Sequence, residues 1–480
     1  MMPAAPWSMR RALPIAILIK GFYFFFFVAQ RDPQWNASLI ASPFALKQLD
    51  TEWYFQPLDE WQETGAYTSI CKLPGFAPIY IPLRWIMSKS AAYNVICVLQ
   101  MLLDALCTVV LATMAFRFFK SRAMYFWVFG IYVFSTFISV RSNYVLSDSF
   151  CTSFFVLSIA ALQSGLDSGR RSMFVWSGLA LLWSFEMRPV MLVVLPVVVV
   201  LILAHSAALR QKLVRMSLIF FPVLIVTLWW NIHNRLLHNR SLWLIAPAEE
   251  CMSHYGPESA AIRRFVIAIG EDFQPWSKGS AAEWFLKRNM ETPPPPPFEQ
   301  KQMASTYNLD TLISIRVDYK RIEHGEELTS QFKNELMLRM DRCTEAYRKE
   351  HGWDYYLFNR LKFLKMFLFP GRIDDLPLPA VEQMNVLQKL VKAGSLLLLW
   401  MVNALAIFGW FLAIAKFKWS ALWWSGLGVS HVVVLGWIGF IEQRYLTAAY
   451  PVLVVFAAYA IYTLWVRIKS KSSKRAFIDA

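Results

Sequence analysis

Two aspartates stand beside long apolar stretches, where their carboxylates could take part in chemistry. Asp50 lies in the segment Asp50-Thr-Glu52-Trp-Tyr54, and Asp148 directly precedes an apolar stretch. A charged group in or beside lipid is costly, so it usually pairs with another group or acts. Two carboxylates on one face of a membrane could deprotonate an acceptor and orient it. Taken singly, Asp148 also suits a helix N-cap, and Asp50 suits an ordinary solvated loop.

Four cationic or titratable side chains also lie at the edges of apolar stretches: Lys72, Arg188, His233 and Arg444. If they converge, they could hold a phosphate group by charge-assisted hydrogen bonds. The alternative for each residue alone is a side chain that reaches the lipid headgroups from the end of a helix.

The composition indicates a membrane protein that must position these groups with helices. The chain has 480 residues with a mean hydropathy of +0.38, and only 17% of them are charged, against about a quarter in soluble domains. Apolar stretches of the ~20 residues needed to cross a bilayer recur along it. The net charge is +15, but many basic residues flank apolar stretches, so we predict no nucleic acid partner.

The pattern predicts an all-α polytopic membrane protein of about ten spans with a mixed extracytoplasmic domain. Arg10 and Arg11 precede the first span and basic residues fill the C-terminal tail, which predicts both termini in the cytoplasm. We expect the cell inner (plasma) membrane. The predicted parts are an N-terminal membrane module (1–233) with a first outer loop (31–93), an extracytoplasmic domain (234–392), and C-terminal membrane helices with a basic tail (393–480).

The predicted outer segments contain local signals of their own. The short apolar piece Pro78 to Met87 predicts an interfacial or re-entrant helix, and Pro293 to Pro297 predicts a stiff polyproline stretch. Apolar positions from Ser330 to Lys349 fit one helical face, and Tyr356 to Phe369 suits a helix on the outer leaflet. Cys71, Cys251 and Cys343 lie outside the apolar spans, so a disulfide among them is an option whose pairing the sequence does not fix.

Several short blocks, taken in order, resemble the polyprenyl-phosphate-sugar-dependent glycosyltransferases of the GT-C fold. The closest branch is the family 39 group of protein mannosyltransferases and aminoarabinose transferases. The similar blocks are Asp50-Thr-x-x-Tyr54, Lys72-x-Pro74-Gly75-Phe76, Gln100 to Asp104, Leu146-Ser147-Asp148-Ser149, Arg188-Pro189, Trp230-Asn-Ile-His233-Asn234, and Arg444-Tyr445 with Tyr450-Pro451.

The chain departs from the family pattern at two of these blocks. His233 stands where the family has arginine, so a fixed cation becomes a titratable one, and Arg235, which directly follows this block, could substitute. Asp148 stands where the family has the longer glutamate, which changes the reach of that carboxylate.

The resemblance implies inverting transfer of a sugar from a polyprenyl-phosphate donor to a lipid, glycan or protein acceptor at the extracytoplasmic face. Asp50 would be the general base and Asp148 would orient the acceptor or that base. Lys72 and Arg444, with Arg188 and His233, would bind the donor phosphate, and Tyr54 and Tyr445 would contact substrate. No cofactor or metal ligand set is specified, and a divalent cation is an alternative.

Two other functions share the same helical bundle. A transporter or flippase of a lipid-linked substrate would place ionisable groups at mid-membrane and often contain paired repeats; Lys20 is the one such group that stands out. A non-catalytic assembly subunit would instead bind a partner through its outer segment and would not need Asp50.

Overall fold

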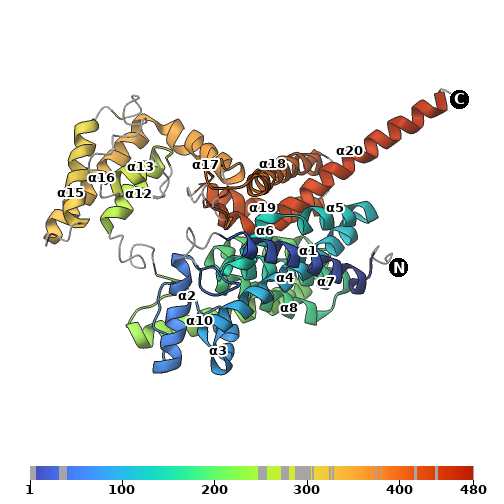
Figure 1. Ribbon diagram of the computed structural model, residues 1–480, viewed down its shortest axis with the longest axis horizontal. Helices are drawn as coiled ribbons and strands as arrows, with labels where there is room; N and C mark the ends of the chain where they lie inside the picture. The colour runs from blue at the N-terminus through green and yellow to red at the C-terminus, as the bar shows by residue number, and fades with distance from the viewer. Residues whose placement is uncertain are drawn as a thin grey trace. The chain divides into compact units, whose positions relative to one another are not determined.

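The computed structural model describes residues 7–31, 40–246, 257–271, 281–286, 304, 307–323, 326, 329–371, 373, 376–379, 381–415, 419–437 and 442–478 (Figure 1). It is 81% helical, and its described residues form no strand. The chain divides into two compact units: unit 1 comprises 1–245, 368–432 and 443–480, and unit 2 comprises 246–367 and 433–442. The prediction of an all-α protein is therefore confirmed for the described residues.

Six helices of unit 1 are long and apolar enough to cross a membrane. They are α1 (Met9–Ala29), α4 (Lys89–Phe119), α7 (Ser147–Ser168), α10 (Leu209–His238), α18 (Val386–Ala415) and α20 (Tyr450–Ile478). Ser88 caps α4 by accepting a hydrogen bond from the Ala91 amide, which satisfies one of the amides left free at a helix start.

The remaining predicted spans correspond to shorter or bent helices. α5 (Arg122–Val133) is followed, after a 50° bend, by α6 (Thr136–Ser139) and the 3₁₀ turn η1 (Val140–Asn143); as one span they raise the count to seven. The others are α8 (Arg171–Met187), η2 (Pro189–Val194) with α9 (Leu195–Ala204), and α19 (Trp419–Trp437). Ten spans stays a prediction.

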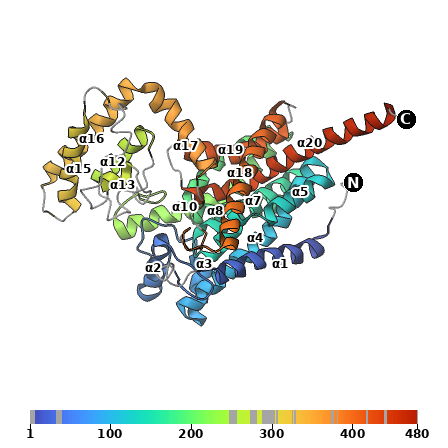
Figure 2. The ribbon, with the colours of Figure 1, turned by 45° about the horizontal axis from the view of Figure 1, so that its top comes forward.

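The long helices of unit 1 pack closely side by side. α1, α4, α7 and α8 form successive neighbours, and α18 pairs with α20 (Figures 1 and 2). Two glycines allow the closest approaches: a Cβ on Gly178 of α8 would collide with the Ile219 carbonyl of α10, and one on Gly409 of α18 with the Phe456 carbonyl of α20. Small residues bring helix backbones together in the same way in other membrane bundles.

One ion pair lies inside this bundle, between α1 and α4. Lys20 Nζ lies 2.8 Å from Asp104 Oδ2 and donates to Tyr132 O and Ser139 Oγ, each at 3.0 Å. Both charged side chains are at most 2% exposed. The lysine within the first span thus faces the interior of the bundle and is paired there.

Two short helices of unit 1 lie in the segment predicted as the first outer loop. They are α2 (Leu49–Thr64) and α3 (Ala77–Ile86), and α3 occupies the predicted piece Pro78 to Met87. Asp59 of α2 accepts from the Tyr80 hydroxyl of α3 at 2.7 Å and lies 2.9 Å from Lys89 Nζ. These contacts tie both helices to the start of α4.

Unit 2 is built around helices whose apolar faces bury one another. Its helices are α12 (Pro257–Ala268), α13 (Ala281–Leu286), α15 (Leu309–Glu323), α16 (Ser330–Glu350), the π-helical turn η3 (Asp354–Phe358) and α17 (Asn359–Leu368). Leu336, Met340, Cys343 and Tyr347 of α16 are buried among Phe265, Trp284 and other core residues, as the helical pattern predicts. A mixed domain was predicted for 234–392, but the described residues of unit 2 form helices and no strand.

Two predicted features lie outside the described residues: the Pro293 to Pro297 stretch and Cys251. Among the other cysteines, Cys71 is disulfide-bonded, whereas Cys343 is a free, buried thiol. Cys343 packs in the core of unit 2, where free cysteines behave as small apolar side chains.

Candidate functional site

The first carboxylate, Asp50, sits in the first turn of α2. This helix begins there because the Gln48 amide donates to Thr51 Oγ1 at 2.9 Å in a capping box. Asp50 Oδ2 lies 2.8 Å from Arg444 Nη2 of η4 (Gln443–Ala448). The two side chains are 18% and 14% exposed, so the pair is shielded but still accessible.

The second carboxylate, Asp148, sits in the first turn of α7. Its Oδ2 lies 2.6 Å from Arg188 Nη2, which follows α8 at the break before Pro189. These side chains are only 2% and 7% exposed. Asp148 Oδ1 and Arg188 Nε are buried and have no hydrogen-bond partner among the described residues. The buried pair therefore keeps one unused acceptor and one unused donor, and leaving such groups unpaired is costly.

Tyr445 joins the two pairs. The Arg188 guanidinium lies 4.5 Å from the Tyr445 ring centroid, and the Arg444 guanidinium lies 5.6 Å from it. His431 Nε2 lies 2.9 Å from Tyr445 O and so donates to that carbonyl. We call Asp50, Asp148, Arg188, Arg444 and Tyr445 the aspartate–arginine site.

Lys72 and Tyr54 border this site from the loop after α2 and from α2 itself. Lys72 Nζ lies 4.5 Å from the Tyr54 ring centroid, and Ser147 Oγ donates to Tyr54 Oη at 2.9 Å. Burial raises the pKa of Asp50, but the positive charges of Arg444, Lys72 and Arg188 outweigh it and hold that pKa below its usual value. These three cations therefore act together on one carboxylate.

Main-chain hydrogen bonds hold the two carboxylate-bearing segments together. The Leu46 amide donates to Asn143 O at 2.8 Å, and the Val145 amide donates to Leu46 O at 2.9 Å. Thr51 Oγ1 donates to Val145 O at 3.1 Å, and Gln100 Nε2 of α4 donates to Leu146 O at 2.8 Å. The segment before α2 and the segment before α7 are thus joined by hydrogen bonds.

His233 lies apart from the aspartate–arginine site. Its Nε2 lies 2.8 Å from Tyr67 O, and its ring stacks against Trp229 at 5.3 Å. Tyr67 Oη in turn donates to Lys72 O at 2.9 Å. His233 therefore supports the loop that carries Lys72, and its Nε2 is occupied by a main-chain carbonyl.

Three residues that contact the site or its border were not predicted from the sequence: Ser147, His431 and Gln48, whose Oε1 accepts from Arg444 at 3.3 Å. Ser147 and Gln48 stand within two residues of the selected aspartates, which is a signal that could have found them. His431 lies inside an apolar helix, and a lone histidine there gives no sign of its partner.

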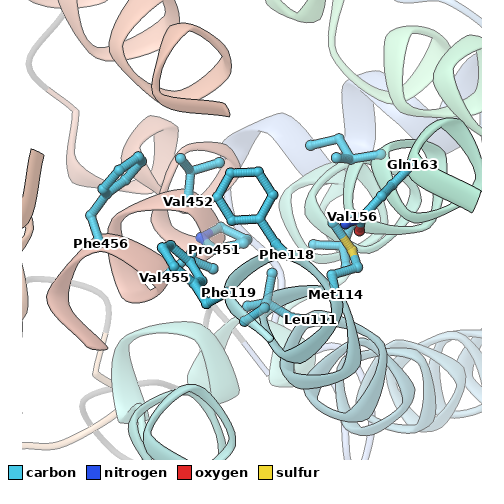
Figure 3. A pocket seen from close by; sticks show the side chains of 12 residues that line it. Leu111, Met114, Phe118, Phe119, Val156, Gln163, Pro451, Val452, Val455 and Phe456 are labelled. Carbon is cyan, nitrogen blue, oxygen red and sulfur yellow. The ribbon is translucent and has the colours of Figure 1, made fainter. Parts of the chain in front are cut away.

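Other parts of the described structure offer less for chemistry. The described residues contain no group of three or more His, Cys, Asp or Glu side chains that could hold a metal ion. A cavity of about 30 Å³ between α4, α7 and α20 is lined by apolar side chains with Gln163 as its one polar residue (Figure 3). Its lining contains no cationic side chain that could bind a phosphate.

Comparison of the sequence with models of known protein families and with curated protein sequences found no match.

Proposed function

We propose that this protein is a membrane glycosyltransferase that moves a sugar from a polyprenyl-phosphate donor to an acceptor, with inversion at the anomeric carbon. The observation that carries this proposal is the aspartate–arginine site itself. Two shielded carboxylates are each paired with an arginine, and both arginines lie against the Tyr445 ring. Lys72 borders the site over the Tyr54 ring. Such a set supplies both a base and a phosphate-binding surface.

Arg444, Arg188 and Lys72 would bind the donor phosphate. All three cations lower the pKa of Asp50, so the positive charge of each acts at that carboxylate. Arginine presents a planar fork of donors that matches phosphate oxygens. Arg188 Nε is a donor without a partner among the described residues, so it can meet an incoming oxygen.

Asp50 would take the proton from the acceptor hydroxyl or amine as that atom attacks the anomeric carbon. The bond between this carbon and the phosphate oxygen breaks, and polyprenyl phosphate departs with its electron pair. Negative charge grows on the departing phosphate, which the three cations stabilise. Asp148 Oδ1, the unused buried acceptor, would orient the attacking group, while Tyr54 and Tyr445 would line the sugar site.

The reaction would take place on the extracytoplasmic face of the cell inner membrane. Cys71 is disulfide-bonded and lies one residue from Lys72, and disulfides persist in oxidising compartments. Basic residues before the first span and after the last one favour cytoplasmic termini. Both observations support this orientation.

The test is the Asp50→Asn substitution in protein reconstituted in vesicles with radiolabelled polyprenyl-phosphate sugars and envelope lipid extract. We expect the release of polyprenyl phosphate to fall ~10²- to 10⁴-fold, because a positioned general base contributes about that much. Glu63→Gln, an exposed change on the same helix, is the matched control and should retain full activity. Full activity in Asp50→Asn would rule out this base.

A further inference from the structure

A large apolar groove lies beside the aspartate–arginine site within unit 1. Its volume is about 800 Å³, within the range of sites that enclose an organic ligand. It is lined by residues of α2, α3 and the turn before it, α7, α8 and α10: Trp61, Pro74, Gly75, Ala77, Pro78, Phe154, Leu157, Ala161, Trp176, Leu179, Ala180, Leu182, Trp183, Glu186, Val226 and Trp229.

Glu186 is the only charged side chain among these sixteen residues. It is 9% exposed and forms no hydrogen bond or ion pair with the part of the chain that the structure describes. Burying a carboxylate without a partner is costly. By contrast, a second groove of about 450 Å³ between α1, α6 and α18 has no acidic or basic side chain in its lining. The acid therefore distinguishes the first groove from an ordinary lipid-facing crevice.

The groove and the aspartate–arginine site share two short segments of chain. Pro74 and Gly75 line the groove, while the next residue, Phe76, contacts the Tyr54 ring at 5.6 Å. Trp183 Nε1 donates to Gly75 O at 3.0 Å, which closes the groove against that turn. Glu186 precedes Arg188 by two residues. The groove is thus connected to the aspartate–arginine site through these two segments.

The charge of the lining decides which substrate the groove fits. A polyprenyl phosphate is anionic at its polar end, and the groove lining offers it no cation, because Arg188, Arg444 and Lys72 are not among the lining residues. A carboxylate instead accepts hydrogen bonds from a hydroxyl or an ammonium group. Apolar walls with four tryptophans suit a hydrocarbon chain.

We propose that this groove binds the hydrocarbon chain of a lipid acceptor, and that Glu186 accepts a hydrogen bond from a hydroxyl or ammonium group at its polar end. The inference rests on the proposed function only in calling this lipid the acceptor. The donor and acceptor then approach from two sides: the anionic donor at the arginines and the hydrogen-bond-donating lipid at Glu186.

The experiment is photolabelling of the full-length protein in vesicles with three diazirine probes that share one chain: hexadecanol, hexadecylamine and hexadecanoic acid. Labelled peptides are mapped by mass spectrometry. We expect the alcohol and the amine to label the 154–161 and 176–186 segments, and the acid to label them several-fold less. Equal labelling by all three probes would overturn the role of Glu186.

Two variants separate the parts of the proposal. Glu186→Gln keeps the size of the side chain and should lower amine labelling roughly tenfold, because hydrogen bonds to charged groups are the stronger ones. Ala161→Trp should fill the groove and lower labelling by every probe, whereas Gly394→Trp, in the second groove, should leave it unchanged. Unaltered labelling in both Glu186→Gln and Ala161→Trp would overturn the site.

Labelling does not depend on sugar transfer, so the two proposals fail separately. If Asp50→Asn retains transfer activity but the probes label the groove as described, the base is wrong and the lipid site stands. If Asp50→Asn is inactive and the probes label no groove residue, the transferase stands and the acceptor binds elsewhere.

Discussion

The Lys20–Asp104 pair and the aspartate–arginine site are both shielded groups of opposite charge, yet they differ in their unused donors and in their accessibility. The Lys20 ammonium donates to Asp104, Tyr132 and Ser139 and so uses all three of its donors. The side chains of Lys20 and Asp104 are each at most 2% exposed. Each pair keeps one buried carboxylate oxygen without a hydrogen-bond partner among the described residues, Asp104 Oδ1 and Asp148 Oδ1. The aspartate–arginine site also has an unused donor, Arg188 Nε, and a partly accessible carboxylate, Asp50.

This difference separates a structural pair from a reactive one. An ammonium whose donors are all used holds two helices in register, and it offers nothing to a ligand. A site with spare donors and acceptors, reachable from outside, can bind an incoming group without first breaking a contact. A transporter would need its mid-membrane charges to be available, and Lys20 is not.

Breaking the closed pair should have the largest effect on stability. Lys20→Met leaves Asp104 buried without its counter-charge, which costs about 3–5 kcal/mol when one partner of a buried pair is removed. Unfolding of the purified protein in mixed detergent micelles, followed by circular dichroism, measures the loss.

The control for this change is the double substitution Lys20→Met with Asp104→Leu. Replacing both members of a buried pair by apolar groups is often neutral, so stability should return and sugar transfer should persist. A single variant as stable as the unaltered protein would contradict the structural role of the pair.

Changing the open site should affect transfer more than folding. Arg188→Lys keeps the charge but loses the planar fork that pairs with Asp148 and stacks on Tyr445. A hydrogen bond to a charged group is worth about 1.5–3 kcal/mol, so kcat/KM for the donor should fall roughly 10- to 100-fold. Arg117→Lys, an exposed change at the end of α4, serves as control and should retain normal kinetics.

The pH dependence of transfer should report the charges around Asp50. Arg444, Lys72 and Arg188 hold the pKa of Asp50 below its usual value despite burial, so Asp50 keeps its negative charge to lower pH than an ordinary aspartate. In Arg444→Gln the lowering charge is gone while burial remains, so the acid limb of the kcat/KM profile should move to higher pH. If the acid limb of the profile does not move in Arg444→Gln, a titratable group other than Asp50 determines its position.

The linked effect on folding has a definite sign. A carboxyl whose pKa is lower in the folded state stabilises that state above its unfolded pKa, and this stabilisation is lost as pH falls through the folded value. Unfolding measured as pH falls below roughly 4, the ordinary aspartate pKa, should therefore show a smaller decline with acid in Arg444→Gln than in the unaltered protein.

The smallest effect is expected for an exposed pair. Arg264 and Asp341 of unit 2 lie 3.0 Å apart and are 50% and 45% exposed. Solvent screens such pairs, so Asp341→Ala should change stability by less than ~1 kcal/mol. A loss as large as that of Lys20→Met would mean that exposure does not separate the pairs.

The sequence predicted features that depend on local pattern. Apolar length located the long helices, and the spacing of Leu336, Met340 and Cys343 predicted α16. Topology also selected Asp50, Lys72, Asp148 and Arg444 as residues of one face. These predictions rest on hydropathy and helical period, which a single sequence contains.

The partners of these residues could not be predicted. Asp50 pairs with a residue 394 positions away, and the choice between Arg188 and Arg444 depends on how helices pack. Glu186 was not predicted as a site residue, because the groove that it lines is assembled from five separate elements. The position of His233 against Tyr67 likewise follows from packing.

The main-chain bonds between the Leu46 segment and the Asn143 to Leu146 segment restrict how this chain can evolve. They use backbone atoms, so replacing the side chain of Leu46 or Val145 leaves the hydrogen bonds available. Inserting or deleting one residue in either segment shifts every bond after it and moves Asp50 relative to Asp148. Relatives of this protein should therefore vary in composition along these segments while keeping their length.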